Sequence, residues 1–337
     1  MSPAFLPHSS ITGIGSLPLT DVQTALRLVA QLCPEVPFWP QLPRLSEREY
    51  MIEQMLGSRI DFLTPRLAEY GYRVQPGLLQ SFLQELQTGI ASLDERYASG
   101  FFAFEQAVTA GLFPRARALK GQLIGPITLA CMLFNEERVF LLDQEHLAAV
   151  SHYVTCFALW QAQHLQQAGL PVICFLDEPC LALLNHVPFQ AVTEQAAQAL
   201  HSVVTALQAA GMLVGIHCCA GLTSFRTMCQ AAPDIVSFDA YQDLETFCTD
   251  QDARKFLNAG GLVAFGLIPT SSNLSSLDPV LLFTRWLLAC KDMGDLSQLA
   301  SHTMITATCG LGLLNPSHVE SSFRLTQQIA DLIQRIE

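Results

Sequence analysis

The sequence predicts an α/β protein of the (β/α)8 TIM barrel type, folded as a single domain over residues 1–337. Short apolar runs, each ending abruptly at a polar residue, glycine or proline, alternate with longer segments whose apolar residues recur at helical spacing. Strands that are apolar along their whole length are typical of a parallel sheet covered on both faces. Eight such runs occur, which favours a closed barrel over an open sheet.

The eight runs follow one another along the chain with helical segments between them. In order they are ITGIGS (11–16), VPFWPQ (36–41), KGQLIGP (120–126), VICFLDEP (172–179), LVGIHCC (213–219), IVSFDAY (235–241), LVAFGLIP (262–269) and MITATCG (304–310). Two of the intervening segments, residues 150–169 and 192–211, are amphipathic and end on glycine, a common helix stop. Residues 42–119 are too many for one crossover helix. We therefore expect a helical insertion there, including SEREYMIEQML (46–56), that forms a lid or wall over one barrel mouth.

The charge and cysteine content of the chain exclude several classes of protein. The formal net charge is −12 and the 18 Lys and Arg residues are scattered singly, so we expect no nucleic-acid partner. The 11 cysteines lie in apolar segments, which indicates a reduced, intracellular protein. The start MSPAFLPHSS lacks a signal-peptide pattern, and no apolar stretch reaches membrane-spanning length. We expect a cytoplasmic protein without membrane association.

A barrel of this type carries its chemistry where strands end and the following loops begin. Ligand-type and polar residues occupy most of the predicted strand ends, which are Ser16, Gln41, Gly125, Asp177 with Glu178, His217 with Cys219, Asp239, Gly266 and Cys309. These side chains therefore collect on one face of the predicted barrel. This face is where we expect the functional site.

Four of these residues form a set that suits zinc, and they are His217, Cys219, Cys309 and Asp239. His217 and Cys219 are separated by one residue, so they point to the same side of an extended strand end. The alternative is that the histidine and the cysteines fill the core, where free cysteines are common. We favour zinc because two thiolates, an imidazole and a carboxylate or open position match its preferred ligands.

The spacing of the ligands favours a catalytic metal over a structural one. About 90 residues separate Cys219 from Cys309, whereas structural zinc sites draw their ligands in close pairs. Zinc with thiolate ligands binds an incoming thiol well and deprotonates it, which yields a nucleophile at neutral pH. Alkyl transfer to a thiol is the chemistry that this set predicts.

Five ordered motifs resemble those of the cobalamin-independent methionine synthase family, in its carboxy-terminal catalytic barrel. TGIGSLPLT is similar to the family's I-G-S-F-P motif, GPITLA to G-P-V-T, FLDEP to D-E-P, IHCC to H-x-C, and TCGLG to C-G-L. The superfamily also holds uroporphyrinogen decarboxylase and the corrinoid-linked coenzyme M methyltransferases. The resemblance covers most of the chain and implies a zinc-dependent methyltransferase that converts homocysteine to methionine.

The resemblance also implies roles for individual residues. The zinc ligands that it implies are His217, Cys219 and Cys309, and the residues that it implies for the amino-acid substrate are Ile14, Gly15, Ser16 and Asp177. Asp239 stands where the family has a glutamate that binds the zinc. Aspartate is one methylene shorter, which leaves three alternatives: Asp239 binds the zinc directly, acts through a water molecule, or leaves the position to the substrate. Gln41 is a loose substitute for a further substrate-binding glutamate. On the residues alone, the D-E-P stretch is equally the start of a turn or helix.

A corrinoid is the methyl donor that the sequence predicts. Contacts that the family makes to folylpolyglutamate have no counterpart, since the tryptophan after G-P-V-T is replaced near Met132 and FGLIPTSSN contains no histidine. The chain resembles the short core methionine synthases, for which methylcobalamin or another methyl-corrinoid, free or on a corrinoid protein, is the implied donor. Three alternatives stay open, namely another small thiol of the coenzyme M type, a metal-free barrel of the uroporphyrinogen decarboxylase kind, and a non-catalytic barrel with a structural metal.

Overall fold

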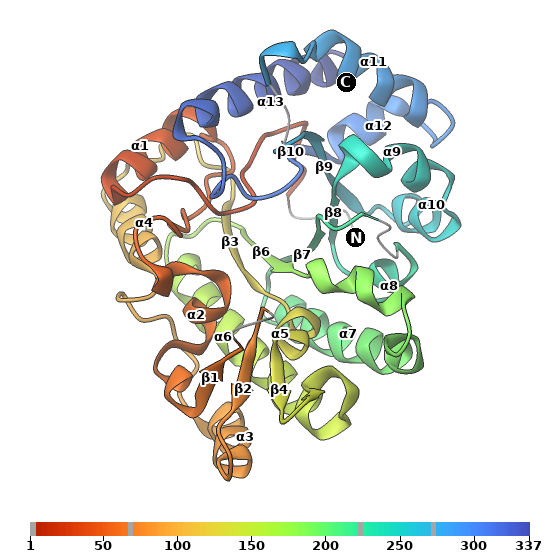
Figure 1. The fold of residues 1–337 in the computed structure, drawn as a ribbon. Coiled ribbons are helices and arrows are strands. Elements are labelled where there is room, and N and C mark those ends of the chain that lie inside the picture. The colour runs from red at the N-terminus through yellow and green to blue at the C-terminus, as the bar shows by residue number, and fades with distance from the viewer. Residues whose placement is uncertain (1–4, 67–69, 222–224, 271–273) are drawn as a thin grey trace.

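A parallel sheet of six strands forms the centre of the computed structural model, which describes residues 5–66, 70–221, 225–270 and 274–337. The strands, in the spatial order β10-β9-β8-β7-β6-β3, are β3 (Leu119–Ile124), β6 (Val172–Asp177), β7 (Leu213–Cys218), β8 (Ile235–Phe238), β9 (Leu262–Ile268) and β10 (Thr303–Ala307). Figure 1 shows these strands in the middle of the molecule with helices around them. The α/β class that the sequence predicts is confirmed, with a curled parallel sheet of the TIM-barrel kind.

The sheet is buried on both faces, which explains why its strands are apolar along their length. Every residue of β3, β6, β8, β9 and β10 is buried. Alternate strand residues and three residues outside the strands form an inner cluster that includes no helical residue. The strand residues are Ile173, Phe175, Ile235, Leu262, Ala264 and Met304, and the others are Phe5, Val36 and Ala118. Because side chains alternate along a strand, Asp177 lies on the same face as Ile173 and Phe175, above this cluster.

Two of the eight predicted strands, residues 11–16 and 36–41, form no ladder, so the regular sheet has six strands and not eight. Each segment makes only isolated parallel bridges, which are Ile11 with Ile305, Ser16 with Gln41, and Phe38 with Lys120. Pro37 and Pro40 have no N–H to donate, and Gly13 and Gly15 weaken a strand, so neither segment can sustain a ladder. The bridges still join the two edges of the sheet through these segments.

Helices cover the outer face of the sheet. The predicted segments 150–169 and 192–211 correspond to α6 (Gln144–Gln166) and α7 (Thr193–Ala209). The other covering helices are α1 (Val22–Leu32), α5 (Pro126–Met132), α8 (Phe225–Gln230), α9 (Ala240–Thr249), α10 (Gln251–Asn258), α11 (Pro279–Cys290), α12 (Leu296–Ser301) and α13 (Val319–Gln334). The last helix, α13, packs against the first, α1 (Figure 1). Among the helices that the structure describes, none is long and apolar enough to cross a membrane.

Aspartates start many of these helices. Their carboxylates accept hydrogen bonds from backbone N–H groups of the first turn, and they are Asp21, Asp143, Asp239, Asp250, Asp278 and Asp295. One of them, Asp239, is also a predicted metal ligand. Its carboxylate is therefore engaged by the first turn of α9.

The 42–119 insertion holds strands as well as the predicted helices. Its helices are α2 (Met51–Leu56), α3 (Leu79–Thr88) and α4 (Ser99–Thr109). Its strands β1 (Leu63–Pro65) and β2 (Tyr72–Val74) join β4 (Leu133–Asn135) and β5 (Arg138–Val139) in a second sheet ordered β1-β2-β4-β5. Strands of this length are too short to give a periodic signal in the sequence. Figure 1 shows this sheet to one side of the central strands, near α3.

Short 3-10 helices complete the described chain. They are η1 (Glu47–Glu49), η2 (Gly57–Phe62), η3 (Phe140–Leu142), η4 (Pro179–Asn185), η5 (Phe189–Val192), η6 (Leu274–Ser276) and η7 (Pro316–His318). The first of these and α2 together occupy the predicted helical segment 46–56.

Candidate metal centre

Three soft ligand side chains from two strand ends converge at the carboxyl edge of the sheet. His217 lies on β7, Cys219 follows that strand, and Cys309 comes two residues after β10. Their ligand atoms all lie within 4.8 Å of one another, and the two sulfurs are 3.2 Å apart. His217 is buried and both cysteines are half-buried. Only the tertiary fold can bring together residues that are 90 positions apart.

The His217 imidazole has one nitrogen held and the other free. Its Nδ1 is 2.9 Å from the Ser237 hydroxyl on the neighbouring strand β8. Its Nε2 is buried and has no hydrogen-bond partner among the described residues. A ring fixed through one nitrogen, with the other buried beside two sulfurs, is the usual arrangement of a metal-binding histidine. The three residues therefore fit a soft divalent ion such as zinc.

The contact between the two sulfurs makes the acidities of the thiols unequal. The hydrogen bond with Cys219 lowers the pKa of Cys309 to about 4, and His217 acts in the same direction. The same contact, together with burial, raises the pKa of Cys219. At neutral pH the pair therefore holds one proton. The thiolate is the form that binds metal ions, so one sulfur is already in the form that a metal ligand requires.

Asp239 lies outside this cluster of three. It is the N-cap of α9, where its Oδ1 accepts from the Gln242 backbone N–H at 3.0 Å. Its Oδ2 accepts from the Gln242 side chain at 2.8 Å. Both oxygens thus have partners within the helix that Asp239 begins. In this structure Asp239 therefore acts as a helix cap, apart from the three clustered ligand atoms.

Asp177 and Glu178 follow one another at the end of β6 and face opposite ways. Asp177 is paired in register with His217 and lines the same cavity, and its Oδ1 is buried without a partner among the described residues. Burial raises the pKa of Asp177 to about 6, while His217 and Lys120 act against this rise. Glu178 accepts from the backbone N–H and hydroxyl of Thr128, at 2.7 and 2.6 Å, and so anchors the start of α5. Asp177 is available to a ligand, and Glu178 is structural.

A cavity of about 300 Å³ opens beside the metal-ligating cluster. Its described lining residues are Ile14, Ser16, Gln41, Pro43, Glu49, Tyr50, Met51, Tyr70, Asp177, Pro179, His217, Cys219, Cys309, Gly310, Gly312 and Leu313. The inner end is polar, whereas Tyr50, Tyr70 and Leu313 are exposed at the outer end. The volume suits a small organic molecule.

Apart from Asp177 on β6, the predicted substrate-binding residues come from the two segments outside the ladder. Ile14, Ser16 and Gln41 line the cavity, and Gly15 joins the first two. A methyl group on Gly15 would lie 2.5 Å from Gln41 Oε1 and 2.9 Å from Gln122 Cδ, so a larger residue there would displace these two side chains. The Ser16 hydroxyl accepts from the Gly312 N–H at 3.2 Å. The structure therefore places all of these residues at or against one wall of the cavity.

The insertion contributes cavity residues that no motif indicates, and these are Pro43, Glu49, Tyr50, Met51 and Tyr70. Glu49 is buried, and burial raises its pKa. Its carboxylate accepts from the backbone N–H of Leu42 at 3.2 Å and of Ser99 at 3.1 Å, and from the Ser99 hydroxyl. Glu49 thus ties two parts of the insertion together. The helical spacing of 46–56 predicts an element but not which of its residues reach the cavity.

The charges of the cavity wall are of one sign. Among the described lining residues none is Lys or Arg, and the carboxyl groups are those of Asp177 and Glu49. The oxygens of Glu49 are already hydrogen-bonded, whereas Asp177 keeps a free one. The cavity therefore favours a ligand with a positively charged group placed at Asp177.

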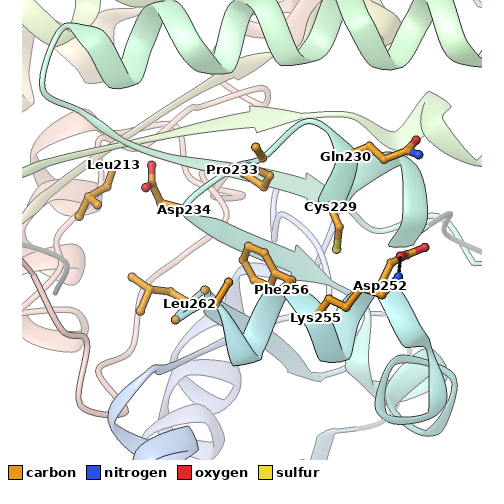
Figure 2. Close-up of a pocket in the computed structure, with 13 residues that line it drawn as sticks. Leu213, Cys229, Gln230, Pro233, Asp234, Asp252, Lys255, Phe256 and Leu262 are labelled. Atoms are coloured by element: carbon orange, nitrogen blue, oxygen red, sulfur yellow. Dashed lines mark hydrogen bonds and ion pairs between the residues drawn. The ribbon is translucent and has the colours of Figure 1, made fainter. Parts of the chain in front are cut away.

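A second cavity, of about 510 Å³, lies at the opposite edge of the sheet (Figure 2). Its walls include Leu213, Asp234 and Leu262, at the amino ends of β7, β8 and β9. Figure 2 shows Lys255 paired with Asp252, at 3.1 Å, and the backbone of β7 donates to Asp234 at 2.8 Å. These charged groups already have partners in the protein. Barrels carry their chemistry at the other edge, so the cavity beside His217 is the candidate site.

Fold and site together define an α/β barrel-like protein with a thiol-rich cluster at the carboxyl ends of its strands. The chain matches no protein-family model and no curated protein. Its fold does match a solved structure, that of a B12-independent methionine synthase from Shewanella sp. W3-18-1 in complex with selenomethionine. The match covers 98% of each chain with a TM-score of 0.60 and 14% sequence identity. At this identity the similarity shows a shared fold over the whole chain.

Proposed function

We propose that this protein is a zinc-dependent methyltransferase that transfers a methyl group to the thiol of homocysteine and so forms methionine. One observation carries the proposal: a buried histidine nitrogen without a partner and two sulfurs meet beside the unpartnered carboxylate of Asp177, in one cavity. A thiol-activating metal and an ammonium partner are what an amino-acid thiol requires. The fold shared with a methionine synthase supports the same activity.

The roles of the chain's own residues follow from their positions. His217, Cys219 and Cys309 hold the metal, and Ser237 orients the His217 ring. When bound, zinc supplies the positive charge that keeps the acceptor sulfur deprotonated at neutral pH. With zinc held by His217, Cys219 and Cys309, the acceptor sulfur would complete its ligand set.

The charge of the cavity favours homocysteine over an anionic thiol of the coenzyme M type. Asp177 receives the ammonium group of an amino acid, and the Ile14-Gly15-Ser16 wall lies beside it. A sulfonated thiol has no ammonium group, and no described lining residue is a cation that would compensate its charge. Its negative charge would meet two carboxyl groups and two thiols instead.

A methyl-corrinoid is the donor that we propose, either free or on a corrinoid protein. The cavity mouth is apolar and aromatic, with Tyr50, Met51, Tyr70 and Leu313, and offers a surface against which the flat ring of a large macrocyclic donor would pack. In the reaction the sulfur–carbon bond forms as the cobalt–carbon bond breaks. The electron pair stays on cobalt as cob(I)alamin, and the thiol proton goes to solvent. This cleavage needs no proton donor at the leaving group.

The test is an assay of zinc-loaded protein with homocysteine and either methylcobalamin or methyl-folate polyglutamate. We expect methionine from methylcobalamin alone. The Cys309→Ser variant is expected to lose stoichiometric zinc and activity. The matched control is Cys218→Ser, one residue from a ligand but packed in the outer core, which is the large apolar cluster between the sheet and its helices. This control is expected to keep both. Methionine from methyl-folate only would reject the donor. Full zinc content in Cys309→Ser, or wild-type protein that binds no zinc, would reject the metal site.

A further inference from the structure

Lys120 is a fully buried lysine inside the curled sheet, on β3, and no motif accounts for it. Its Nζ donates to the backbone carbonyl of Ile14 at 2.7 Å and to Gln122 Oε1 at 3.1 Å. The same ammonium lies 4.5 Å from the centre of the Phe175 ring, within range of a cation–π interaction. Lys120 is thus placed between the inner apolar cluster and the candidate site. Burying an ammonium group is costly, so its retention calls for a function.

Gln122, two residues further along β3, extends the same network. Its side-chain oxygen accepts from Lys120, and its Nε2 donates to the backbone carbonyl of Trp39 at 2.9 Å. The side chain of Gln122 also packs against Gly15, where an added methyl group would lie 2.9 Å from its Cδ. Lys120 and Gln122 therefore contact both segments that lack ladder hydrogen bonds, 11–16 and 36–41.

Those two segments carry one wall of the cavity. Ile14, Ser16 and Gln41 line it, yet among the described residues these segments join the sheet through isolated bridges and a few backbone hydrogen bonds, and not through a continuous ladder. In a regular strand, ladder hydrogen bonds on both sides would fix the backbone. Here the side chains of β3 replace part of that ladder from inside the sheet.

We propose that Lys120, with Gln122, is a positioning residue that holds the Ile14-Gly15-Ser16 wall in the geometry that binds the amino-acid substrate. The proposal rests on the proposed function for the identity of that substrate. Lys120 is not among the described residues that line the cavity, so it acts through Ile14 and not on the substrate itself. A charged donor holds a carbonyl more strongly than a neutral one would, because the surroundings are dry.

The charge of Lys120 is also compatible with its surroundings. Burial lowers the pKa of Lys120 to about 8, and the negative charge of Asp177 opposes this fall. The ammonium form therefore persists at neutral pH. Lys120 also places a positive charge beneath the unpartnered carboxylate that faces the substrate.

The test compares Lys120→Met with a matched control, Thr12→Val. Both variants remove a buried hydrogen bond from the 11–16 segment, but Thr12 donates to the Val36 carbonyl, at 2.8 Å, and does not line the cavity. For Lys120→Met we expect the Kd for methionine and the KM for homocysteine to rise about tenfold or more, with kcat and zinc content nearly unchanged. Thr12→Val is expected to keep wild-type values of both constants.

Hydrogen–deuterium exchange of residues 11–17 gives a readout that does not depend on activity. We expect faster exchange there in Lys120→Met than in the wild type, and if that variant does not fold, in Gln122→Leu. If the wild-type protein binds neither methionine nor homocysteine, the proposed function is rejected. The exchange of residues 11–17 would then test by itself whether Lys120 positions this segment. Unchanged exchange, or equal affinity in Lys120→Met and the wild type, would overturn the proposal. An equal loss of affinity in Thr12→Val would show that any lost hydrogen bond in the 11–16 segment weakens binding. That result would also overturn the role proposed for Lys120.

Discussion

The imidazole of His217 illustrates how single residues prepare this site. Ser237 holds Nδ1, which orients the ring and leaves the buried Nε2 without a hydrogen-bond partner among the described residues, near the two sulfurs. Two adjacent cysteines have different surroundings for the same reason. Cys219 belongs to the metal-ligating cluster, while Cys218 packs in the outer core. At this scale the function depends on which side of the strand each atom faces.

Ser237→Ala should weaken zinc binding without removing a ligand. Loss of the hydroxyl frees the His217 ring to rotate, and we expect the zinc affinity to fall by about 10- to 100-fold. Competition against a chromophoric chelator measures this change. Thr306→Val is the matched control, because its hydroxyl is buried on β10 of the same sheet and has no partner among the described residues. Equal affinity in Ser237→Ala and the wild type would contradict the role given to Ser237.

Zinc binding should depend on pH through the proton held by Cys219 and Cys309. The pKa of Cys219 is raised and that of Cys309 is lowered, so near neutral pH one proton stays on the pair and must leave when the ion binds. The apparent affinity is therefore expected to rise with pH, by about tenfold per unit for one proton. Calorimetry in buffers of different ionisation enthalpy counts the released proton. A pH-independent affinity would show that both sulfurs are already ionised.

At the scale of elements, strand ends and helix starts compete for the same residues. A polar residue at the carboxyl end of a barrel strand is well placed for catalysis, and also to cap the helix that follows. Asp177 projects into the cavity, whereas Asp239 caps α9 and Glu178 anchors α5. Sequence position alone does not separate these cases, because one residue of shift reverses the direction of a side chain.

Asp239→Ala should therefore affect stability more than metal binding. Loss of the N-cap of α9 is expected to lower the free energy of unfolding by about 1 kcal/mol. Zinc stoichiometry should stay at the wild-type value, as mass spectrometry of the intact protein can determine. Asp250→Ala removes the equivalent cap of α10 and serves as the control. Loss of zinc in Asp239→Ala but not in Asp250→Ala would restore Asp239 as a ligand.

At the scale of the whole molecule, the three candidate metal ligands lie outside the apolar core that holds the fold together. The inner and outer apolar clusters extend through the strands and helices, and the three ligands lie at one edge of the sheet. A metal bound there should stabilise the fold by mass action without being required for it. This arrangement separates the proposed catalytic site from a structural zinc site, whose removal unfolds the chain.

Removal of the metal by a chelator is thus expected to leave a folded protein. Far-ultraviolet circular dichroism should be unchanged, and thermal unfolding should stay cooperative with a lower Tm, because the stabilisation by bound ligand is lost. Re-addition of zinc should restore the original Tm. Cys309→Ser is the control, since its Tm should not respond to zinc. Complete unfolding on chelation would favour the non-catalytic barrel with a structural metal.

The sequence by itself determined the elements that local patterns encode. Apolar runs such as those around Phe175 and Phe265 predict buried parallel strands, and the amphipathic segments predict α6 and α7. Spacing also indicated His217, Cys219 and Cys309 as a set. These predictions depend on short-range periodicity and residue type, which a chain displays before it folds.

Only the tertiary structure decided which residues face the same point in space. It broke the ladder at 11–16 and 36–41, made Asp239 a cap, and placed Lys120 under Ile14. It also brought Tyr50 and Met51 of the insertion to the cavity mouth, and these have no motif. The physical reason is that such contacts join residues far apart in the chain, and their geometry depends on how the strands curl and pack.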